Sequence, residues 1–310
     1  MSVEVRRRLL IDRISMLVEL GSEELYKFVY AQLHGMQDEQ ASLLPTGKIL
    51  VRYQKYKTRL DWYPQYTHSR SGRRKIADIE IGATKIKGQV ALYRFLKVTL
   101  YPSQFRSDEL AHFRFVFDTL LQEFTYAGLF AHGKVTSLEL AADTLSHQQH
   151  SFLPYRTHSR ASSIFIQDDG HHGTTYIGSN ISALRFRIYD KRKQLHDTGK
   201  ATFTKLMPHT RIEAAMRRLG VSPANLLVLE NPFAKLRIAD LAKANALFSN
   251  GDQIAFLSEC MTYGVQSALA KRSKHHRAKY RGMLDSIPVT WWHPDEIWKD
   301  LSQALAVIAP

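Results

Sequence analysis

The sequence predicts an α+β fold, in which a mostly antiparallel central sheet is flanked by helices and a helical part follows at the C-terminus. Several short segments alternate apolar and polar residues, which is typical of antiparallel strands with one solvated face. Around these segments, apolar residues recur at helical spacing. With 310 residues, 44% of them hydrophobic, the chain can bury a sizeable core in one large or two smaller domains.

Helices are predicted from capping residues and from the spacing of apolar residues. The first forty or so residues read as helix, with Ser22 as an N-cap followed by two acids that favour the helix dipole. A second helix is predicted to begin at Ser107, and Ser222–Pro223 marks the start of the helical C-terminal part. Residues 147–173, rich in His, Ser and Gly, read as a long connection or a hairpin.

The strands follow from period-two alternation, in which every second residue is apolar. The predicted strands lie at residues 49–53, 79–81, 96–100, 138–142 and 184–188. We therefore expect three parts along the chain. They are an N-terminal helical segment over residues 1–45, an α+β domain over 46–220 and a basic helical part over 221–310.

The charge of the chain points to a polyanionic partner. Lys and Arg number 43 against 29 acids, so the formal net charge is +14. Such an excess raises the local concentration of polyanions at the protein surface. Nucleic acid is the first candidate partner and an anionic membrane surface is the second, while a merely soluble basic surface is the plain alternative.

Cysteine and hydropathy exclude other classes. Cys260 is the single cysteine, which excludes a disulfide framework and a cysteine-based zinc site within one chain. Asp12 and Arg13 interrupt the apolar stretch behind the N-terminal arginines, so a secretory signal is not expected. No apolar run approaches membrane-spanning length, and we expect a cytoplasmic protein with no membrane partner.

One predicted strand carries a tyrosine among cations. In residues 184–191, Arg185, Arg187, Tyr189 and Lys191 share the face opposite the apolar residues. Attack of a phenol on a phosphodiester needs cations that bind the scissile phosphate and, as we expect here, help to lower the phenol pKa. The alternative is an ordinary solvated basic strand.

Acids stand on the polar faces of two other strands. Glu139 and Asp143 point away from Leu138 and Leu140, and Arg211 and Glu213 point away from Ile212. Converging carboxylates make a hard-oxygen site for Mg²⁺ or Mn²⁺, whereas each acid alone is also explained by an ion pair. None of the 14 histidines has a partner two positions away, so carboxylates are the expected metal ligands.

Two basic segments are predicted to contact nucleic acid. Six basic residues lie within 271–281, which favours a phosphate-contacting helix or arm over a merely solvated helix face. A smaller basic loop near Gly72 is predicted to grip DNA or to be a soluble turn. The contacts we expect are Arg73 and Arg74 in the loop, Lys274, Arg277, Lys279 and Arg281 in the helix, and Arg185 and Arg211 on the strands.

The sequence resembles the Rep_trans family of plasmid rolling-circle replication initiators, which has relatives in phages and mobile elements. The most specific match is residues 175–179 (Thr-Tyr-Ile-Gly-Ser), then Ser182 and residues 187–191 (Arg-Ile-Tyr-Asp-Lys). Weaker matches lie at residues 97–102, 135–143, 211–213 and 277–281, and the order agrees over about residues 90 to 285.

The resemblance implies roles for individual residues. It makes Tyr189 the nucleophile and Tyr176 structural, with Lys191 and Arg187 as phosphate contacts. It makes Glu139 and Glu213 metal ligands, and Asp143 is a further candidate ligand. Three positions depart from the family pattern, which leaves the completeness of the metal site open. They are Ser137, Thr99 and Gln194, and the acids that could replace the one missing at Thr99 are Asp78, Glu80 and Asp143.

The function expected from the resemblance is origin nicking by the domain at residues 46–220. Tyr189 would cut one strand of an inverted-repeat origin at a single-stranded nick site, leaving a 5′-phosphotyrosine link and a free 3′-OH. The resemblance also implies a homodimer and a host helicase. Two alternatives are a relaxase or transposon-type nickase and a non-catalytic DNA-binding regulator. The origin sequence and the host are not predicted.

Overall fold

The computed structural model describes most of the chain in two compact units. Unit 1 comprises Met1–Leu9, Leu140–Arg217 and Glu230–Leu301, and unit 2 comprises Leu10–Glu139, Arg218–Leu229 and Ser302–Pro310. The division into parts at residues 45 and 220 stays a prediction. The described residues are 9–35, 48–52, 58–63, 74–85, 92–106, 108–122, 124–145, 147–157, 161–166, 172–198 and 209–310.

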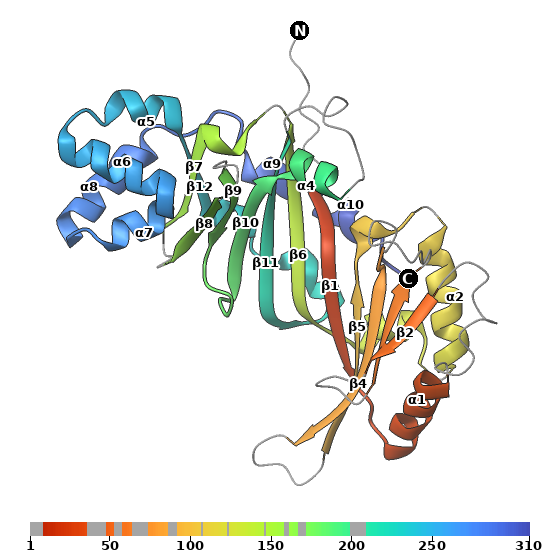
Figure 1. The fold of residues 1–310 in the computed structure, drawn as a ribbon. Helices are drawn as coiled ribbons and strands as arrows, with labels where there is room; N and C mark the ends of the chain where they lie inside the picture. The colour runs from red at the N-terminus through yellow and green to blue at the C-terminus, as the bar shows by residue number, and fades with distance from the viewer. Residues whose placement is uncertain are drawn as a thin grey trace. The chain divides into compact units, whose positions relative to one another are not determined.

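Unit 2 is built on antiparallel strands with helices against them. Its strand order is β2-β3-β4-β5-β1-β6, and β6 continues into unit 1. Helix α1 packs against β3 and β5 and contacts α2 (Figure 1). The bounds are β1 (Leu9–Glu19), β2 (Lys48–Arg52), β3 (Thr58–Tyr63), β4 (Ala77–Lys85), β5 (Leu92–Leu100), β6 (Lys134–Leu145), α1 (Glu23–Gly35), η2 (Pro102–Gln104), α2 (Glu109–Leu121), α3 (Tyr126–His132), η5 (Pro223–Val228) and α10 (Leu301–Ala306).

The first of these strands corrects the prediction that the N-terminal segment is helical. Strand β1 pairs with β5, with Ile14 opposite Leu100 and Val18 opposite Leu96. Ile14, Met16 and Val18 are all buried at period-two spacing, so pairing across the sheet decided this segment rather than local helix propensity. The helix after it was correctly predicted, because Ser22 Oγ accepts the N–H of Leu25 at 3.0 Å.

The predicted helix near residue 107 is confirmed as α2. It begins at Glu109, with Asp108 at the N-cap, while Ser107 lies outside the described residues. Its apolar stripe is buried, and Phe113 packs edge-on against Trp62 of β3, with ring centroids 5.1 Å apart.

Unit 1 also contains antiparallel strands, and it includes most of the helical C-terminal part. Its strand order is β6-β11-β10-β9-β8, and β7 pairs separately with β12. Residues 147–173, predicted as a connection or a hairpin, contain β7, and β8 pairs with β9. The bounds are η3 (Gln149–Ser151), β7 (Phe152–Arg156), β8 (Ser162–Ile166), β9 (His172–Ile177), β10 (Leu184–Asp190), α4 (Lys191–Asp197), β11 (His209–Val221), η6 (Pro232–Lys235) and β12 (Leu236–Asp240).

The C-terminal helices have an apolar core of their own. Helices α5 to α8 lie together beside β7, β8 and β12 (Figure 1). Phe256 of α6 stacks on Tyr280 of α8, with ring centroids 4.4 Å apart, and Cys260 is buried in the same cluster. The bounds are α5 (Leu241–Leu247), α6 (Gly251–Tyr263), α7 (Val265–Ala270), α8 (Lys274–Asp285) and α9 (Pro294–Trp298).

The fold class is therefore the predicted one: an antiparallel sheet flanked by helices, with helices at the C-terminus. Among the helices that the structure describes, none has the length and apolar character needed to cross a membrane.

Candidate functional site

Arg185, Arg187 and Tyr189 share a face of β10, a central strand of unit 1, as predicted, whereas Lys191 lies beyond the strand as the first residue of α4. Strand β10 pairs with β11 so that Arg187 lies opposite Glu213 and Tyr189 opposite Arg211. Phe186 and Ile188 are fully buried on the other face of β10. Because side chains alternate along a strand, β10 and β11 present these four polar residues on one face.

The centre of this face is a hydrogen bond between a phenol and a carboxylate. Tyr189 Oη donates to Glu213 Oε1 at 2.7 Å, while Arg187 Nε donates to Glu213 Oε2 at 2.6 Å. The Arg187 guanidinium lies 4.9 Å from the centroid of the Tyr189 ring, and Lys191 Nζ lies 5.8 Å from it. Tyr189 is only 7% exposed and Glu213 only 4%, so the carboxylate and the phenol interact largely out of water.

The electrostatics of the phenol correct one prediction. Burial raises the pKa of Tyr189 well above its usual value, and the charge of Glu213 and the hydrogen bond to it raise it further. Arg211 and Arg187 act in the opposite direction, but they do not outweigh burial and Glu213. The cations thus act on the phenol pKa in the expected direction, but the net shift is upward, because burial and Glu213, which the prediction left out, outweigh them.

A second cluster on the same face joins β6 to β11. Arg211 binds both carboxylate oxygens of Asp143 at 2.6 Å each. His209 Nε2 lies 3.1 Å from Asp143 Oδ1, within ion-pair distance but without hydrogen-bond geometry. Burial by itself raises the pKa of Asp143, but the contacts with Arg211 and His209 outweigh it and hold that pKa well below its usual range.

The sequence reasoning missed His209. It stands two residues before Arg211 and four before Glu213, so the same alternation places all three on one face of β11. Extending the predicted strand backwards by one pair of residues would have found it.

The predicted metal ligands are each held by a cation. Glu213 binds Arg187, Asp143 binds Arg211, and Glu139 in unit 2 accepts a hydrogen bond from Arg13. Within the described residues, no group of three or more His, Cys, Asp or Glu side chains is placed to hold a metal ion. These side chains do not form a ready-made metal site, and the involvement of Mg²⁺ or Mn²⁺ stays a prediction.

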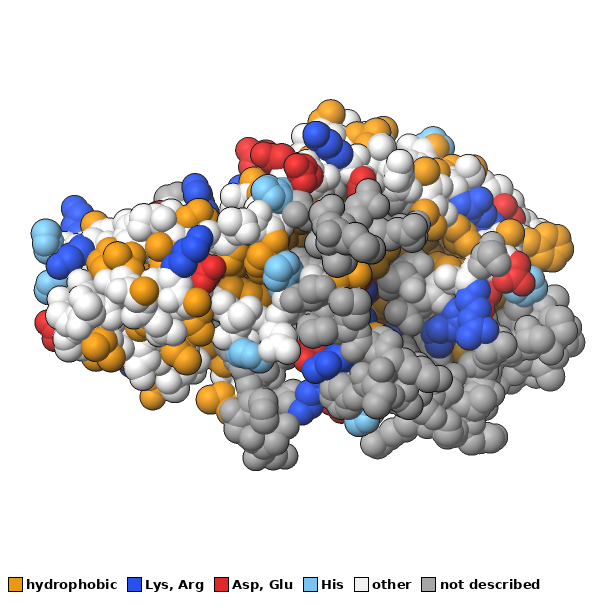
Figure 2. Space-filling model, turned by 90° about the horizontal axis from the view of Figure 1, so that it is seen from above, with side chains coloured by type: hydrophobic (Ala, Val, Ile, Leu, Met, Phe, Trp, Pro, Cys, Tyr) orange, Lys and Arg blue, Asp and Glu red, His pale blue; other side chains and the backbone are white. Residues whose placement is uncertain are grey.

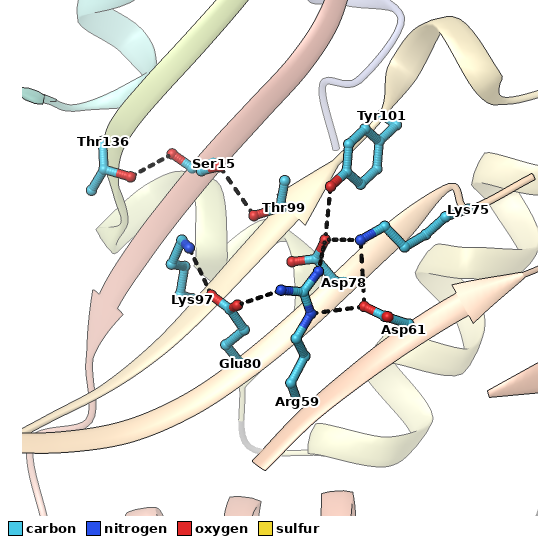
Figure 3. A network of polar contacts seen from close by, with 10 residues as sticks. All are labelled: Ser15, Arg59, Asp61, Lys75, Asp78, Glu80, Lys97, Thr99, Tyr101 and Thr136. Atoms are coloured by element: carbon cyan, nitrogen blue, oxygen red, sulfur yellow. Dashed lines mark hydrogen bonds and ion pairs between the residues drawn. The ribbon is translucent and has the colours of Figure 1, made fainter. Parts of the chain in front are cut away.

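Two of the acids that could replace the carboxylate missing at Thr99 lie in unit 2, namely Asp78 and Glu80. Thr99 Oγ1 lies 3.0 Å from Ser15 Oγ, and Tyr101 Oη donates to Asp78 at 3.0 Å (Figure 3). Lys75 Nζ lies 2.9 Å from Asp78, and Lys97 Nζ lies 2.6 Å from Glu80. Both acids are thus bound by lysines.

A single arginine at the centre of this network contacts three carboxylates. Arg59 Nε lies 2.8 Å from Asp61, and its terminal nitrogens lie 3.3 Å from Asp78 and 3.2 Å from Glu80 (Figure 3). The three acids are at most 4% exposed. Arg59, Lys75 and Lys97 offset their charge, so the arrangement is a largely buried ion-pair network that links β3, β4 and β5.

Three of the arginines predicted to contact nucleic acid from the strands and the loop contact other side chains of the protein. Arg185 lies over the Tyr176 ring, 3.9 Å from its centroid, and Arg211 is only 7% exposed. Arg74 donates to Glu109 Oε2 at 2.8 Å, and Arg73 lies outside the described residues.

The predicted basic helix is confirmed as α8, and its charges face outward. Ser273 caps the helix by accepting the N–H of His276 at 3.3 Å. Tyr280 and Leu284 are buried, one helical turn apart, and form the inner seam. Lys, Arg and His side chains are visible over the C-terminal helices in Figure 2. On α8 the outward cations are Lys274, Arg277 and Lys279, which are exposed, and Arg281, which is half-buried.

Comparison with known proteins finds remote likeness to solved structures. No family model matches the chain, and no curated protein matches it. It is similar to the solved structure of a rolling circle replication initiator protein from Geobacillus stearothermophilus, with 11% identity and a TM-score of 0.35, over 93% of this chain and 100% of that one. A TM-score of this size carries no argument about fold or function.

Proposed function

We propose that this chain nicks one strand of its origin DNA, with Tyr189 as the nucleophile, to start rolling-circle replication. The observation that carries the proposal is the placement of the phenol. Tyr189 hydrogen-bonds a carboxylate and lies beside Arg187 on one face of a paired strand, with Lys191 of α4 near its ring. Residues 175–191 resemble the Rep_trans motif, and this resemblance indicates a reaction in which the phenol attacks a DNA phosphate.

The proposed reaction is a transesterification. Tyr189 Oη attacks the scissile phosphorus, the bond from phosphorus to the 3′ oxygen breaks, and the products are a 5′-phosphotyrosine link and a free 3′-OH. Arg187, whose side chain is 41% exposed, and Lys191 hold the phosphate and offset the charge that develops on its oxygens. The proposed reaction includes a divalent ion, which would be held by oxygens of the DNA phosphate and by one or two carboxylates.

The DNA partner is proposed to be a double-stranded origin with an inverted repeat and a single-stranded nick site. The outward cations of α8 supply phosphate contacts, which position DNA without reading its sequence. A homodimer and a host helicase complete the proposal through the family resemblance. Mobilisation of DNA would use the same chemistry. The test between the two roles is whether purified protein and a host helicase replicate a plasmid that carries the origin, as expected for a replication initiator.

A second candidate function is a DNA-binding regulator without catalysis. The buried phenol and its raised pKa favour it, because a neutral phenol is a weak nucleophile. The two functions differ in whether a covalent protein–DNA adduct forms.

The test uses the full chain with supercoiled and single-stranded DNA that flanks its coding region, in Mg²⁺ or Mn²⁺. We expect a covalent adduct with wild type and with Tyr176→Phe, and none with Tyr189→Phe. Tyr176 is the matched control, because it lies opposite Arg187 on the neighbouring strand β9. An adduct retained in Tyr189→Phe contradicts the nucleophile, and no adduct with wild type across metals and origins supports the regulator.

A further inference from the structure

The proposed nicking reaction needs a group that removes the phenol proton, and the structure places one acid in contact with it. Tyr189 Oη already donates to Glu213 Oε1 at 2.7 Å, which is within the distance that proton transfer requires. Both residues lie within paired strands and not on loops, because β10 and β11 pair from Leu184 to Asp190. The donor and acceptor are therefore held in place before any DNA binds.

The contact made by the second carboxylate oxygen explains the orientation of Glu213. Arg187 Nε donates to Oε2 at 2.6 Å, which leaves Oε1 for the phenol. The Arg187 guanidinium is charged at any physiological pH, so it favours the carboxylate form of Glu213. Two further cations lie near this pair among the residues that the structure describes, Arg211 on β11 and Lys191 at the start of α4.

The same contacts disagree with the metal-ligand role that the family resemblance implies for this acid. One oxygen of Glu213 is occupied by Tyr189 and the other by Arg187, and Glu213 is only 4% exposed. The other predicted ligand of unit 1, Asp143, binds Arg211 through both of its oxygens. A divalent ion at Glu213 would have to displace a hydrogen bond or an ion pair.

We infer that Glu213 is the proton acceptor for Tyr189 in strand cleavage and not a ligand of a divalent metal. This inference rests on the proposed nicking function. As the bond from Tyr189 Oη to phosphorus forms, the phenol proton moves to Glu213 Oε1. The bond from phosphorus to the 3′ oxygen breaks, and that oxygen takes a proton from water. When the strand is rejoined, the 3′ oxygen attacks the phosphorus and its proton goes to water. The bond from phosphorus to Tyr189 Oη breaks, and protonated Glu213 returns its proton to Oη.

The test separates proton transfer from metal binding. Glu213→Gln keeps the shape of the side chain but is a far weaker proton acceptor. We expect single-turnover adduct formation to slow by about 100-fold or more, as for loss of a general base. Mn²⁺ affinity, measured by paramagnetic resonance on protein with and without origin DNA, should stay at the wild-type value. Glu139→Gln is the matched control, since it removes a predicted metal ligand that contacts Arg13.

A second arm keeps the inference testable if Glu213→Gln folds poorly. Glu213→Asp retains the charge and withdraws the acceptor by one methylene, so it should slow the reaction less than Glu213→Gln. A fluorinated tyrosine at position 189, with a more acidic phenol, should restore part of the rate lost in either variant. That rescue is not expected of a residue that acts only by holding the fold.

The outcomes are distinct. Wild-type rates in folded Glu213→Gln, weakened Mn²⁺ binding in that variant, or no rescue by the fluorinated tyrosine would each overturn the proton-acceptor role while nicking by Tyr189 stands. An adduct that survives Tyr189→Phe, or no adduct with wild type, overturns the proposed function and this inference together.

Discussion

Arg211 on β11 binds both carboxylate oxygens of Asp143 on β6, with each nitrogen–oxygen distance at 2.6 Å. Arg211 is only 7% exposed, so its charge is balanced mainly by contacts inside the protein. A bidentate pair of this kind also fixes the orientation of both side chains. It joins the two strands beside the residues that surround Tyr189.

Replacing Asp143 with Asn should destabilise the protein. Asp143→Asn removes the bidentate carboxylate from a buried guanidinium, and we expect the free energy of unfolding to fall by about 3 kcal/mol. Urea unfolding at neutral pH measures this. The control is Glu230→Gln, whose partner Lys235 and own side chain are 46% and 82% exposed, and which should change stability by less than about 0.5 kcal/mol. Equal effects of the two variants would contradict the structural role of the pair.

The same contact predicts a dependence of stability on pH. The pKa of Asp143 is lower in the folded protein than in the unfolded chain, so ionised Asp143 stabilises the fold. This contribution is fully present above the unfolded pKa of about 4 and is lost as the pH falls towards the folded pKa. The difference in unfolding free energy between wild type and Asp143→Asn should therefore shrink between about pH 5 and about pH 2. A difference that stays constant over this range would show that charge is not its source.

The ion-pair network of unit 2 should depend on Arg59. Arg59→Ala leaves Asp61, Asp78 and Glu80 buried without the guanidinium that contacts all three, and we expect a loss of about 3 to 5 kcal/mol. Thermal unfolding is the measurement. Lys27→Ala breaks the exposed pair with Glu23 on α1 and should have an effect of about 0.5 kcal/mol or less. A small effect at Arg59 would mean that water or the lysines replace it.

Arg187 should matter for the rate of cleavage more than for DNA affinity. Arg187→Lys keeps a positive charge but loses the planar fork that binds Glu213 and lies over the Tyr189 ring. We expect adduct formation to slow by about 10-fold or more, while the Kd for origin DNA changes by less than about threefold. Single-turnover cleavage and filter binding provide the two values. The control is Arg185→Lys, because Arg185 lies over Tyr176 instead, and an equal loss there would contradict a specific role for Arg187.

The outward face of α8 should govern the salt dependence of DNA binding. In the triple variant Lys274→Ala, Arg277→Ala and Lys279→Ala, the slope of log affinity against log salt should become shallower by about 0.9 per lost phosphate contact. Binding to origin and to unrelated DNA should weaken together, since phosphate contacts carry no sequence information. Lys243→Ala, which removes an exposed lysine of α5, is the control and should leave the slope unchanged. An unchanged slope in the triple variant would place the DNA elsewhere.

Local patterns were sufficient for the faces of the strands and for several helices. The alternation in residues 184–191 correctly predicted that Arg185, Arg187 and Tyr189 lie on the side opposite Phe186 and Ile188. Such a prediction succeeds because the side-chain direction in a strand depends only on the parity of the position. The capping residue Ser22 and the apolar stripe of α2 worked for the same reason, since both are properties of one helix.

The helix prediction was wrong where pairing with a neighbouring strand competes with local helix propensity. Residues 9–19 contain residues that suit helix and residues that suit strand, and pairing with β5 selected the strand. The sequence shows the alternation of Ile14, Met16 and Val18, but not that an unpaired edge of β5 is there to receive it.

By itself, the sequence determined which side chains share a strand face, the α+β class and the basic segment at residues 271–281. Only the tertiary structure decided which strands became neighbours, and so which charges meet. It paired Tyr189 with Glu213 and Asp143 with Arg211, and it buried the phenol deeply enough to raise its pKa where the adjacent cations predicted the reverse. The physical reason is that side-chain parity is local, whereas burial and charge pairing depend on residues far apart in the chain.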